Sequence, residues 1–171
     1  MTRFEQCLKT VLKSEGGLVN HPKDPGGLTN LGVTRKTWEA WKGRGVTEAE
    51  MSGLTPADVA PLYRQRYWEA SSAHKLPVGL DLLVFDHAVN AGPGRAVRML
   101  QTVLGVAPDG IFGCQSMDAL KGRSVMDLLH TYSAYRESYY RSLPTFGVFG
   151  RGWLRRVKDT LQEAMAYVED S

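Results

Sequence analysis

Apolar residues recur at helical spacing along nearly the whole chain, and the pattern breaks clearly at one place, between residues 16 and 33. Five apolar side chains share one face of the first predicted helix: Phe4, Cys7, Leu8, Val11 and Leu12. This helix is predicted to run from residue 2 to Glu15 and to end at Gly16-Gly17. The stretch GGLVNHPKDPGGLTNLGV that follows is rich in Gly, Pro and Asn, which predicts turns and a short hairpin. The chain is therefore predicted to be mainly α, a helical bundle with one small β-hairpin near the N-terminus.

Capping residues indicate where the later helices begin. Thr34, Thr47 and Thr55 each precede a predicted helix, and the last of these helices reaches Glu69. Further helices are predicted over residues 77–90, 96–104, 114–121, 124–143 and 151–168. The helix-breaking sequence Gly92-Pro93-Gly94 is predicted to separate two lobes, residues 1–92 and residues 93–171.

Composition excludes several classes of protein. The chain has 171 residues with 43% hydrophobic and 23% charged side chains, which is typical of a globular protein. Its net charge of +3 is divided evenly between the two predicted lobes, so nucleic-acid binding is not expected. Cys7 and Cys114 form no disulfide framework, and the histidines have no metal-ligand spacing. We therefore predict an activity that needs neither a metal nor another cofactor.

The N-terminal segment lacks the pattern of a signal peptide. Lys9, Lys13 and Glu15 interrupt its apolar residues, and no segment approaches the roughly 18 apolar residues of a membrane span. The sequence thus predicts a protein that is made in the cytoplasm without an integral membrane segment.

One constellation of polar residues suggests chemistry: Glu15, then Asp24 nine residues later, then Thr29. Hydrolysis of a glycosidic bond needs an acid for the leaving oxygen and a base or nucleophile on the other face of the sugar. A glutamate at the end of a packed helix is a candidate acid, and a hairpin can return Asp24 and Thr29 across a cleft from it. On spacing alone, an exposed glutamate and an ordinary Asp-Pro-Gly-Gly turn are the more common explanation of such a pattern.

Residues 14–34 closely resemble the motif of glycoside hydrolase family 108, a family of lysozyme-like muramidases from phages and bacteria. The matching positions are Glu15, Gly16, Gly17, Asn20, Pro22, Asp24, Pro25, Gly26, Gly27, Thr29 and Gly32. Leu18 departs from the family, which has tyrosine there. The resemblance implies an α+β lysozyme-like fold with Glu15 as the essential catalytic residue. The order Glu, Asp, Thr is also similar to the catalytic triad of phage T4-type lysozymes.

The resemblance continues beyond the first motif. Residues 85–92 are similar to the family's Asp-x-Ala-Val-Asn-x-Gly segment, and residues 94–120 resemble the predicted peptidoglycan-binding lobe that closes its proteins. We predict that Asn30, Asp86 and Asn90 bind substrate. For Asp86 and Asn90, four residues apart on one helix face, a role as buried bracing residues is an equal alternative.

The resemblance implies an N-acetylmuramidase of the endolysin type that cleaves the β-1,4 bond between N-acetylmuramic acid and N-acetylglucosamine. The alternatives are a lytic transglycosylase, which would need only Glu15, and a wall-binding protein without activity. The predicted partner is bacterial peptidoglycan, reached from the host cytoplasm through a holin or another export route, and the protein is expected to be a monomer. Origin in a phage, prophage, gene-transfer particle or bacterium is open.

Aromatic residues also recur at helical spacing near the C-terminus. Four tyrosines fall within one predicted helix: Tyr132, Tyr135, Tyr139 and Tyr140. Such stripes are most often part of a core, and a minority of their rings line sugar grooves by stacking.

Overall fold

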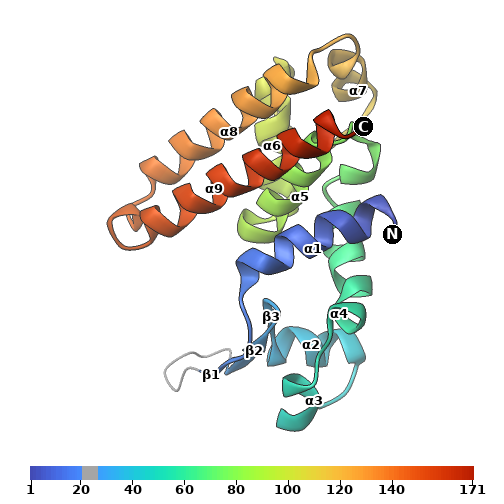
Figure 1. The fold of residues 1–171 in the computed structure, drawn as a ribbon, viewed down its shortest axis with the longest axis vertical. Helices are drawn as coiled ribbons and strands as arrows, with labels where there is room; N and C mark the ends of the chain where they lie inside the picture. The colour runs from blue at the N-terminus through green and yellow to red at the C-terminus, as the bar shows by residue number, and fades with distance from the viewer. Residues whose placement is uncertain (21–26) are drawn as a thin grey trace. The chain divides into compact units, whose positions relative to one another are not determined.

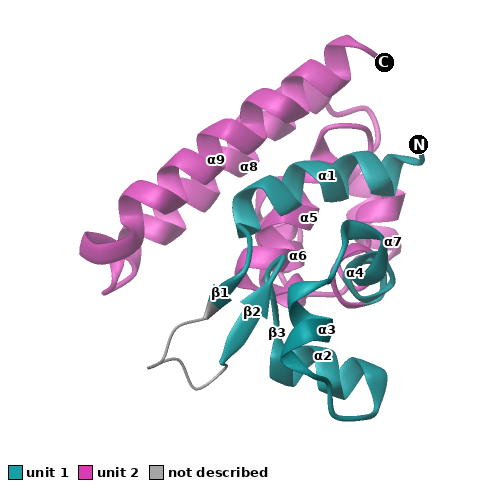
Figure 2. Cartoon of the chain, turned by 60° about the horizontal axis from the view of Figure 1, so that its bottom comes forward, with its two compact units in different colours: residues 1–65 teal, residues 66–171 magenta. Residues whose placement is uncertain are grey.

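The computed structural model describes residues 1–20 and 27–171 and confirms the mainly α fold (Figure 1). The helices are α1 (Arg3–Glu15), α2 (Arg35–Lys42), α3 (Glu48–Ser52), α4 (Pro56–Tyr63), α5 (Leu80–Ala91), α6 (Pro93–Leu104), α7 (Cys114–Leu120), α8 (Val125–Ser142) and α9 (Phe146–Glu169). The chain forms two compact units, Met1–Gln65 and Arg66–Ser171 (Figure 2). None of the described helices is long and apolar enough to cross a membrane.

The first helix follows its sequence pattern closely. Thr2 caps α1 in a capping box with Glu5, and the predicted apolar face is buried, with Cys7 and Val11 completely covered. The helix ends at Gly16, whose φ of 76° suits glycine, and α1 packs against α4. Residue 15 is therefore held at the end of a packed helix.

The predicted hairpin is part of a small three-stranded antiparallel sheet. Its strands are β1 (Val19–Asn20), β2 (Leu28–Asn30) and β3 (Val33–Thr34), with β2 in the centre. Asn30 pairs with Val33 across the two-residue turn Leu31-Gly32. The two central residues have φ values of 49° and 74°, as a type I′ turn requires.

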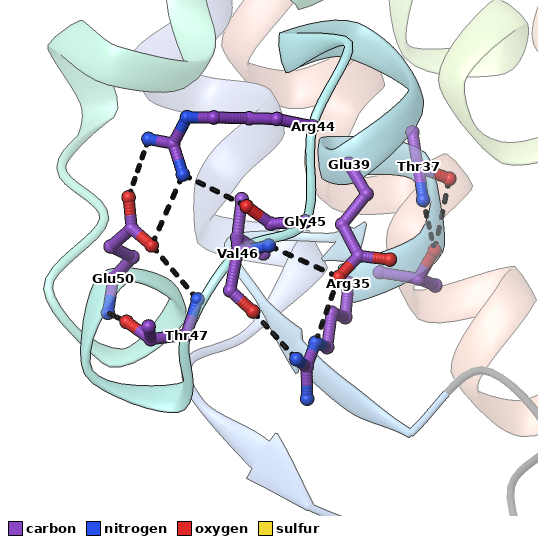
Figure 3. Close-up of polar contacts among 9 residues, drawn as sticks. Arg35, Thr37, Glu39, Arg44, Gly45, Val46, Thr47 and Glu50 are labelled. Carbon is purple, nitrogen blue, oxygen red and sulfur yellow. Dashed lines mark hydrogen bonds and ion pairs between the residues drawn. The ribbon is translucent and has the colours of Figure 1, made fainter.

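A network of charged side chains fixes the connection between α2 and α3 (Figure 3). Glu39 Oε1 accepts hydrogen bonds from Arg35 Nε and from the backbone N–H of Val46, each at 3.1 Å. Arg44 reaches Glu50 Oε1 at 2.6 Å, and Glu50 in turn closes the capping box of α3 with Thr47. These contacts set the position of α3, against which the sheet packs.

The capping threonines at 34, 47 and 55 occupy the predicted N-cap positions of α2, α3 and α4.

The helix that was predicted to reach Glu69 changes from α-helical to π-helical hydrogen bonding before it ends. α4 ends at Tyr63 and is followed by π-helical turns over Arg64–Glu69. Such π segments are rare. The sequence pattern did not indicate this change.

In the second unit, α5 is the central helix. Every residue from Leu80 to Ala88 is buried, and α5 contacts α6, α8 and α9. α6 begins at Pro93 directly after Gly92, so the expected boundary between residues 92 and 93 lies inside this unit. The reason is packing: α5 buries its surface against the helices that follow it. The boundary between the compact units falls between Gln65 and Arg66 instead.

Candidate active site

Glu15 is the last residue of α1, and its side chain is half-buried with the Oε1 atom covered. Beyond it, among the described residues and apart from the chain neighbours of each glycine, no atom lies within 4 Å of the positions where β-carbons on Gly16 and Gly17 would stand. The carboxylate is thus held at the end of a packed helix, and the described residues leave space around the two glycines that follow it. That combination suits a group that must meet a substrate in a defined orientation.

Gly32 in the sheet turn allows the Glu15 carboxylate to approach closely. A β-carbon placed on Gly32 would lie 2.8 Å from Glu15 Oε2 and 3.0 Å from Glu15 Cβ. It would also lie 2.5 Å from the hydroxyl oxygen of Tyr63. Real β-carbons do not approach other atoms this closely, so both side chains occupy space that only glycine leaves free.

Tyr63 holds the turn that Glu15 packs against. It comes from the end of α4, is 1% exposed, and donates a hydrogen bond from its hydroxyl to the carbonyl oxygen of Leu31 at 2.8 Å. Leu31 has a positive φ of 49°, an uncommon conformation for a residue with a branched side chain, and the Tyr63 bond fixes it. Nothing in the sequence spacing links Tyr63 to a turn 32 residues earlier, so sequence analysis missed it.

Thr29 lies on the central strand of the sheet that carries this turn. Its cross-strand neighbours are Val19 and Thr34. Leu28 and Asn30 are buried and Thr29 is half-buried, so the Thr29 side chain faces away from the core side of the sheet. The Leu31-Gly32 turn, which follows this strand, lies against the Glu15 side chain. Asp24 lies outside the described residues.

Asn30 has a structural role in the first compact unit, Met1–Gln65. Its side chain is 6% exposed, and Nδ2 donates to the carbonyl oxygens of Met51 and Ser52 at 2.9 and 3.4 Å. The amide therefore ties β2 to the end of α3. A substrate contact by Asn30 stays a prediction, and any such contact has only its Oδ1 atom and a small exposed surface to use.

Asp86 and Asn90 belong to the second unit, where their contacts favour the bracing alternative. Asp86 is 1% exposed and forms ion pairs with Arg136 at 2.7 Å and Arg156 at 2.8 Å. Asn90 Oδ1 accepts a hydrogen bond from the hydroxyl of Tyr140. Burial raises the pKa of Asp86, but the two guanidiniums outweigh it and hold that pKa below its usual value. Asp86 is thus a carboxylate that joins α5 to α8 and α9.

His87 adds a second buried polar contact to the same helix. Its Nδ1 lies 2.7 Å from the hydroxyl of Tyr132, which donates to the carbonyl oxygen of Ala96. Burial and the nearby Arg136, Arg95 and Arg156 lower the pKa of His87 well below its usual value. The imidazole is therefore neutral at physiological pH and links α5 to α8. In residues 1–20 and 27–171 no group of three His, Cys, Asp or Glu side chains could hold a metal ion.

The close packing at Gly32 gives a testable prediction. If Glu15 is the catalytic residue, as the sequence predicts, Gly32→Ala should lower the rate constant of the catalysed reaction about tenfold or more, because the new methyl group would lie against the Tyr63 hydroxyl and the Glu15 carboxylate, and small displacements of catalytic groups cost large factors. Gly43→Ala is the matched control, since Gly43 has a similar φ of 69° but open space around its β-carbon position. It shares the backbone strain of about 1–2 kcal/mol without touching Glu15. Equal activities of the two variants would contradict this role for Gly32.

A glutamate held at a helix end against a glycine turn of a small sheet, in a mainly α chain, is the arrangement expected of a lysozyme-like glycoside hydrolase. Residues 8–92 match the glycosyl hydrolase 108 family. The solved structure of SagA from Brucella abortus is similar, with a TM-score of 0.85 and 39% sequence identity over 98% of this chain and 97% of that one. No curated protein sequence matches. The chain belongs to glycosyl hydrolase family 108 and has its lysozyme-like fold.

Proposed function

We propose that the protein is a peptidoglycan hydrolase of the endolysin type, an N-acetylmuramidase that cleaves the β-1,4 bond between N-acetylmuramic acid and N-acetylglucosamine. Membership of a glycoside hydrolase family supports the reaction class. The observation that carries the proposal is the position of the Glu15 carboxylate, which lies between the end of α1 and the Leu31-Gly32 turn.

In this mechanism Glu15 is the general acid. It gives its proton to the glycosidic oxygen as the bond from that oxygen to the anomeric carbon breaks. Asp24 acts as the base and takes a proton from a water molecule, whose oxygen forms the new bond to the anomeric carbon. The Thr29 hydroxyl, on the face of the sheet turned away from the core, holds that water.

The products of purified peptidoglycan separate this reaction from its alternatives. Mass spectrometry should find reducing N-acetylmuramic acid ends. Anhydromuramic ends would identify a lytic transglycosylase, and no cleavage would leave a wall-binding protein. Each outcome can be read from one digest, with no need to know the source of the protein.

The stereochemistry of the reaction gives a further prediction. We expect inversion, because a threonine beside the second carboxylate is most useful when there is a water to orient. Inverting enzymes leave roughly 6.5–9.5 Å between their two carboxyl groups for that water, and retaining enzymes only about 5–5.5 Å. Proton NMR of the first-formed sugar should therefore show the α anomer. An initial β anomer would mean that Asp24 acts as a nucleophile.

We further propose that the protein acts as a monomer on the cell wall, after synthesis in the host cytoplasm and release through a holin or another export route. In this proposal residues 1–92 carry out catalysis, and the helical lobe of residues 93–171 binds the wall. Sedimentation of the pure protein should give a mass near 19.0 kDa, and twice that mass would contradict the monomer.

A further inference from the structure

The hydroxyl of Tyr63 and the carboxylate of Glu15 meet at Gly32, although the two side chains come from different helices. Glu15 ends α1 and Tyr63 ends α4, and these helices pack against each other in the first unit (Figure 1). A β-carbon on Gly32 would lie 2.5 Å from the Tyr63 hydroxyl oxygen and 2.8 Å from Glu15 Oε2, so both oxygens border the same point. A change in the shape of the Leu31-Gly32 turn therefore reaches both side chains.

The Leu31-Gly32 turn has a shape that one of its two residues disfavours. A type I′ turn needs a positive φ at both central positions, which suits glycine and strains leucine. Of the described residues other than glycine, only Leu31 and Ser72 have a positive φ. The hydrogen bond from the Tyr63 hydroxyl to the carbonyl oxygen of Leu31, at 2.8 Å, opposes the relaxation of Leu31 to an ordinary φ. The turn thus depends on a contact from outside the sheet.

Tyr63 is itself held firmly by the core of the first unit. Its side chain is 1% exposed, and Val59 and Leu62 of the same helix are 0% and 1% exposed. The π-helical turns begin directly after it, at Arg64, and such segments within helices occur frequently at functional sites. The ring therefore connects a rigid core to a turn that would otherwise relax.

We propose that Tyr63 is a positioning residue for the reaction. Its hydroxyl keeps Leu31 in the left-handed conformation, and the turn held in this way keeps the Glu15 carboxyl group where it meets the glycosidic oxygen. Tyr63 acts without touching the sugar, since almost none of its side chain is exposed. The inference rests on the proposed function for the role of Glu15. It adds a residue that no sequence motif marks, and it names the strained leucine through which that residue acts.

Tyr63→Phe tests the role, because it removes the hydroxyl and keeps the buried ring. We expect kcat on soluble glycan strands prepared from peptidoglycan to fall about tenfold, since small displacements of a catalytic group cost large factors. KM should change by less than about twofold, because the hydroxyl makes no contact with the strand. Rates are compared per folded protein, with circular dichroism giving the folded fraction of each variant. A raised KM with an unchanged kcat would overturn the proposal, because the hydroxyl would then act in binding.

Leu31→Gly separates positioning from general stability. Glycine adopts a positive φ without strain, so the turn keeps its shape with or without the Tyr63 hydrogen bond. The loss of about tenfold caused by Tyr63→Phe should therefore shrink to less than about threefold when both of the compared proteins carry Leu31→Gly. A loss of the original size in that background would overturn the proposal, because Tyr63 would then not act through the conformation of Leu31.

Tyr132→Phe is the matched control for removal of a buried hydroxyl. Tyr132 is 0% exposed and donates to the carbonyl oxygen of Ala96 at 3.2 Å, so the change removes a comparable hydrogen bond from the second unit. It should lower the thermal midpoint and leave kcat within about twofold. An equal fall in kcat for Tyr132→Phe and Tyr63→Phe would overturn the positioning role, because any buried hydroxyl would then matter as much.

Crystal structures of the variants test the inference apart from the reaction. In Tyr63→Phe the Glu15 carboxylate should be displaced from its place beside Gly32, and Leu31→Gly added to Tyr63→Phe should restore it. A carboxylate that keeps its place in Tyr63→Phe would overturn the proposal, whatever the protein cleaves. Failure of the unchanged protein to cleave peptidoglycan would contradict the proposed function instead, so the two failures give different results.

Discussion

Replacing Glu15 by glutamine should lower hydrolysis of purified peptidoglycan by about 100-fold to 10,000-fold, the usual contribution of a general acid. The amide has the shape of the carboxyl group, so packing against Gly32 and the end of α1 is preserved. It has no acidic proton to give to the leaving oxygen. Release of soluble muropeptides at fixed protein concentration measures the loss directly.

Glu48→Gln is the matched control for this change, because Glu48 is an exposed glutamate of the same compact unit. It should retain activity within about twofold, since surface substitutions have small effects. Both variants should show the helical circular dichroism and the thermal midpoint of the unchanged protein. Hydrolysis by Glu15→Gln above about a tenth of the original rate would exclude Glu15 as the general acid.

The elements that sequence analysis located correctly are those with local signals. Thr34, Thr47 and Thr55 accept hydrogen bonds from helix backbone at their predicted positions, because a cap acts within one turn of its own helix. The start of α9 is an exception, because the predicted helix begins only at residue 151. Gly147 and Gly150 suggest a loop before it, but the helix already begins at Phe146, whose ring packs against Gly150.

The contacts that organise the candidate site could not be predicted, because they join residues far apart in the chain. Tyr63 bonds to the carbonyl of Leu31, and Gly32 makes room for Glu15, yet periodicity describes only one element at a time. Likewise, the sequence left substrate contact and bracing as equal alternatives for Asp86, because its ion-pair partners lie 50 and 70 residues further along the chain, on α8 and α9.

Replacing Asp86 by asparagine should destabilise the protein by about 3–5 kcal/mol at pH 7, the usual cost of removing one partner from a buried ion pair. Asp86 and Arg136 are each 1% exposed, so the change leaves the Arg136 guanidinium in the core without a counter-charge. Ordinary domains have only about 5–15 kcal/mol of stability, so the loss should be plain in urea unfolding followed by circular dichroism.

The effect should depend on pH in a defined direction. The pKa of Asp86 is below its usual value in the folded protein, so the unfolded chain takes up this proton first as the pH falls. The stabilisation by the carboxylate is therefore complete above about pH 4, the ordinary value for aspartate, and is lost as the pH falls through the folded pKa. The difference in unfolding free energy between Asp86→Asn and the unchanged protein should accordingly shrink below about pH 4.

Asp118→Asn provides the comparison that isolates burial as the cause. Asp118 pairs with Lys121 at 2.7 Å, as short a contact as that between Asp86 and Arg136, but the two side chains are 68% and 76% exposed. Water and salt screen such a pair, so its removal should cost at most about 1 kcal/mol. If Asp118→Asn and Asp86→Asn lowered the unfolding free energy equally, the ion pairs of Asp86 would not be what joins α5 to α8 and α9. A larger loss for Asp86→Asn that fades on acidification would identify the desolvated Arg136 as its source.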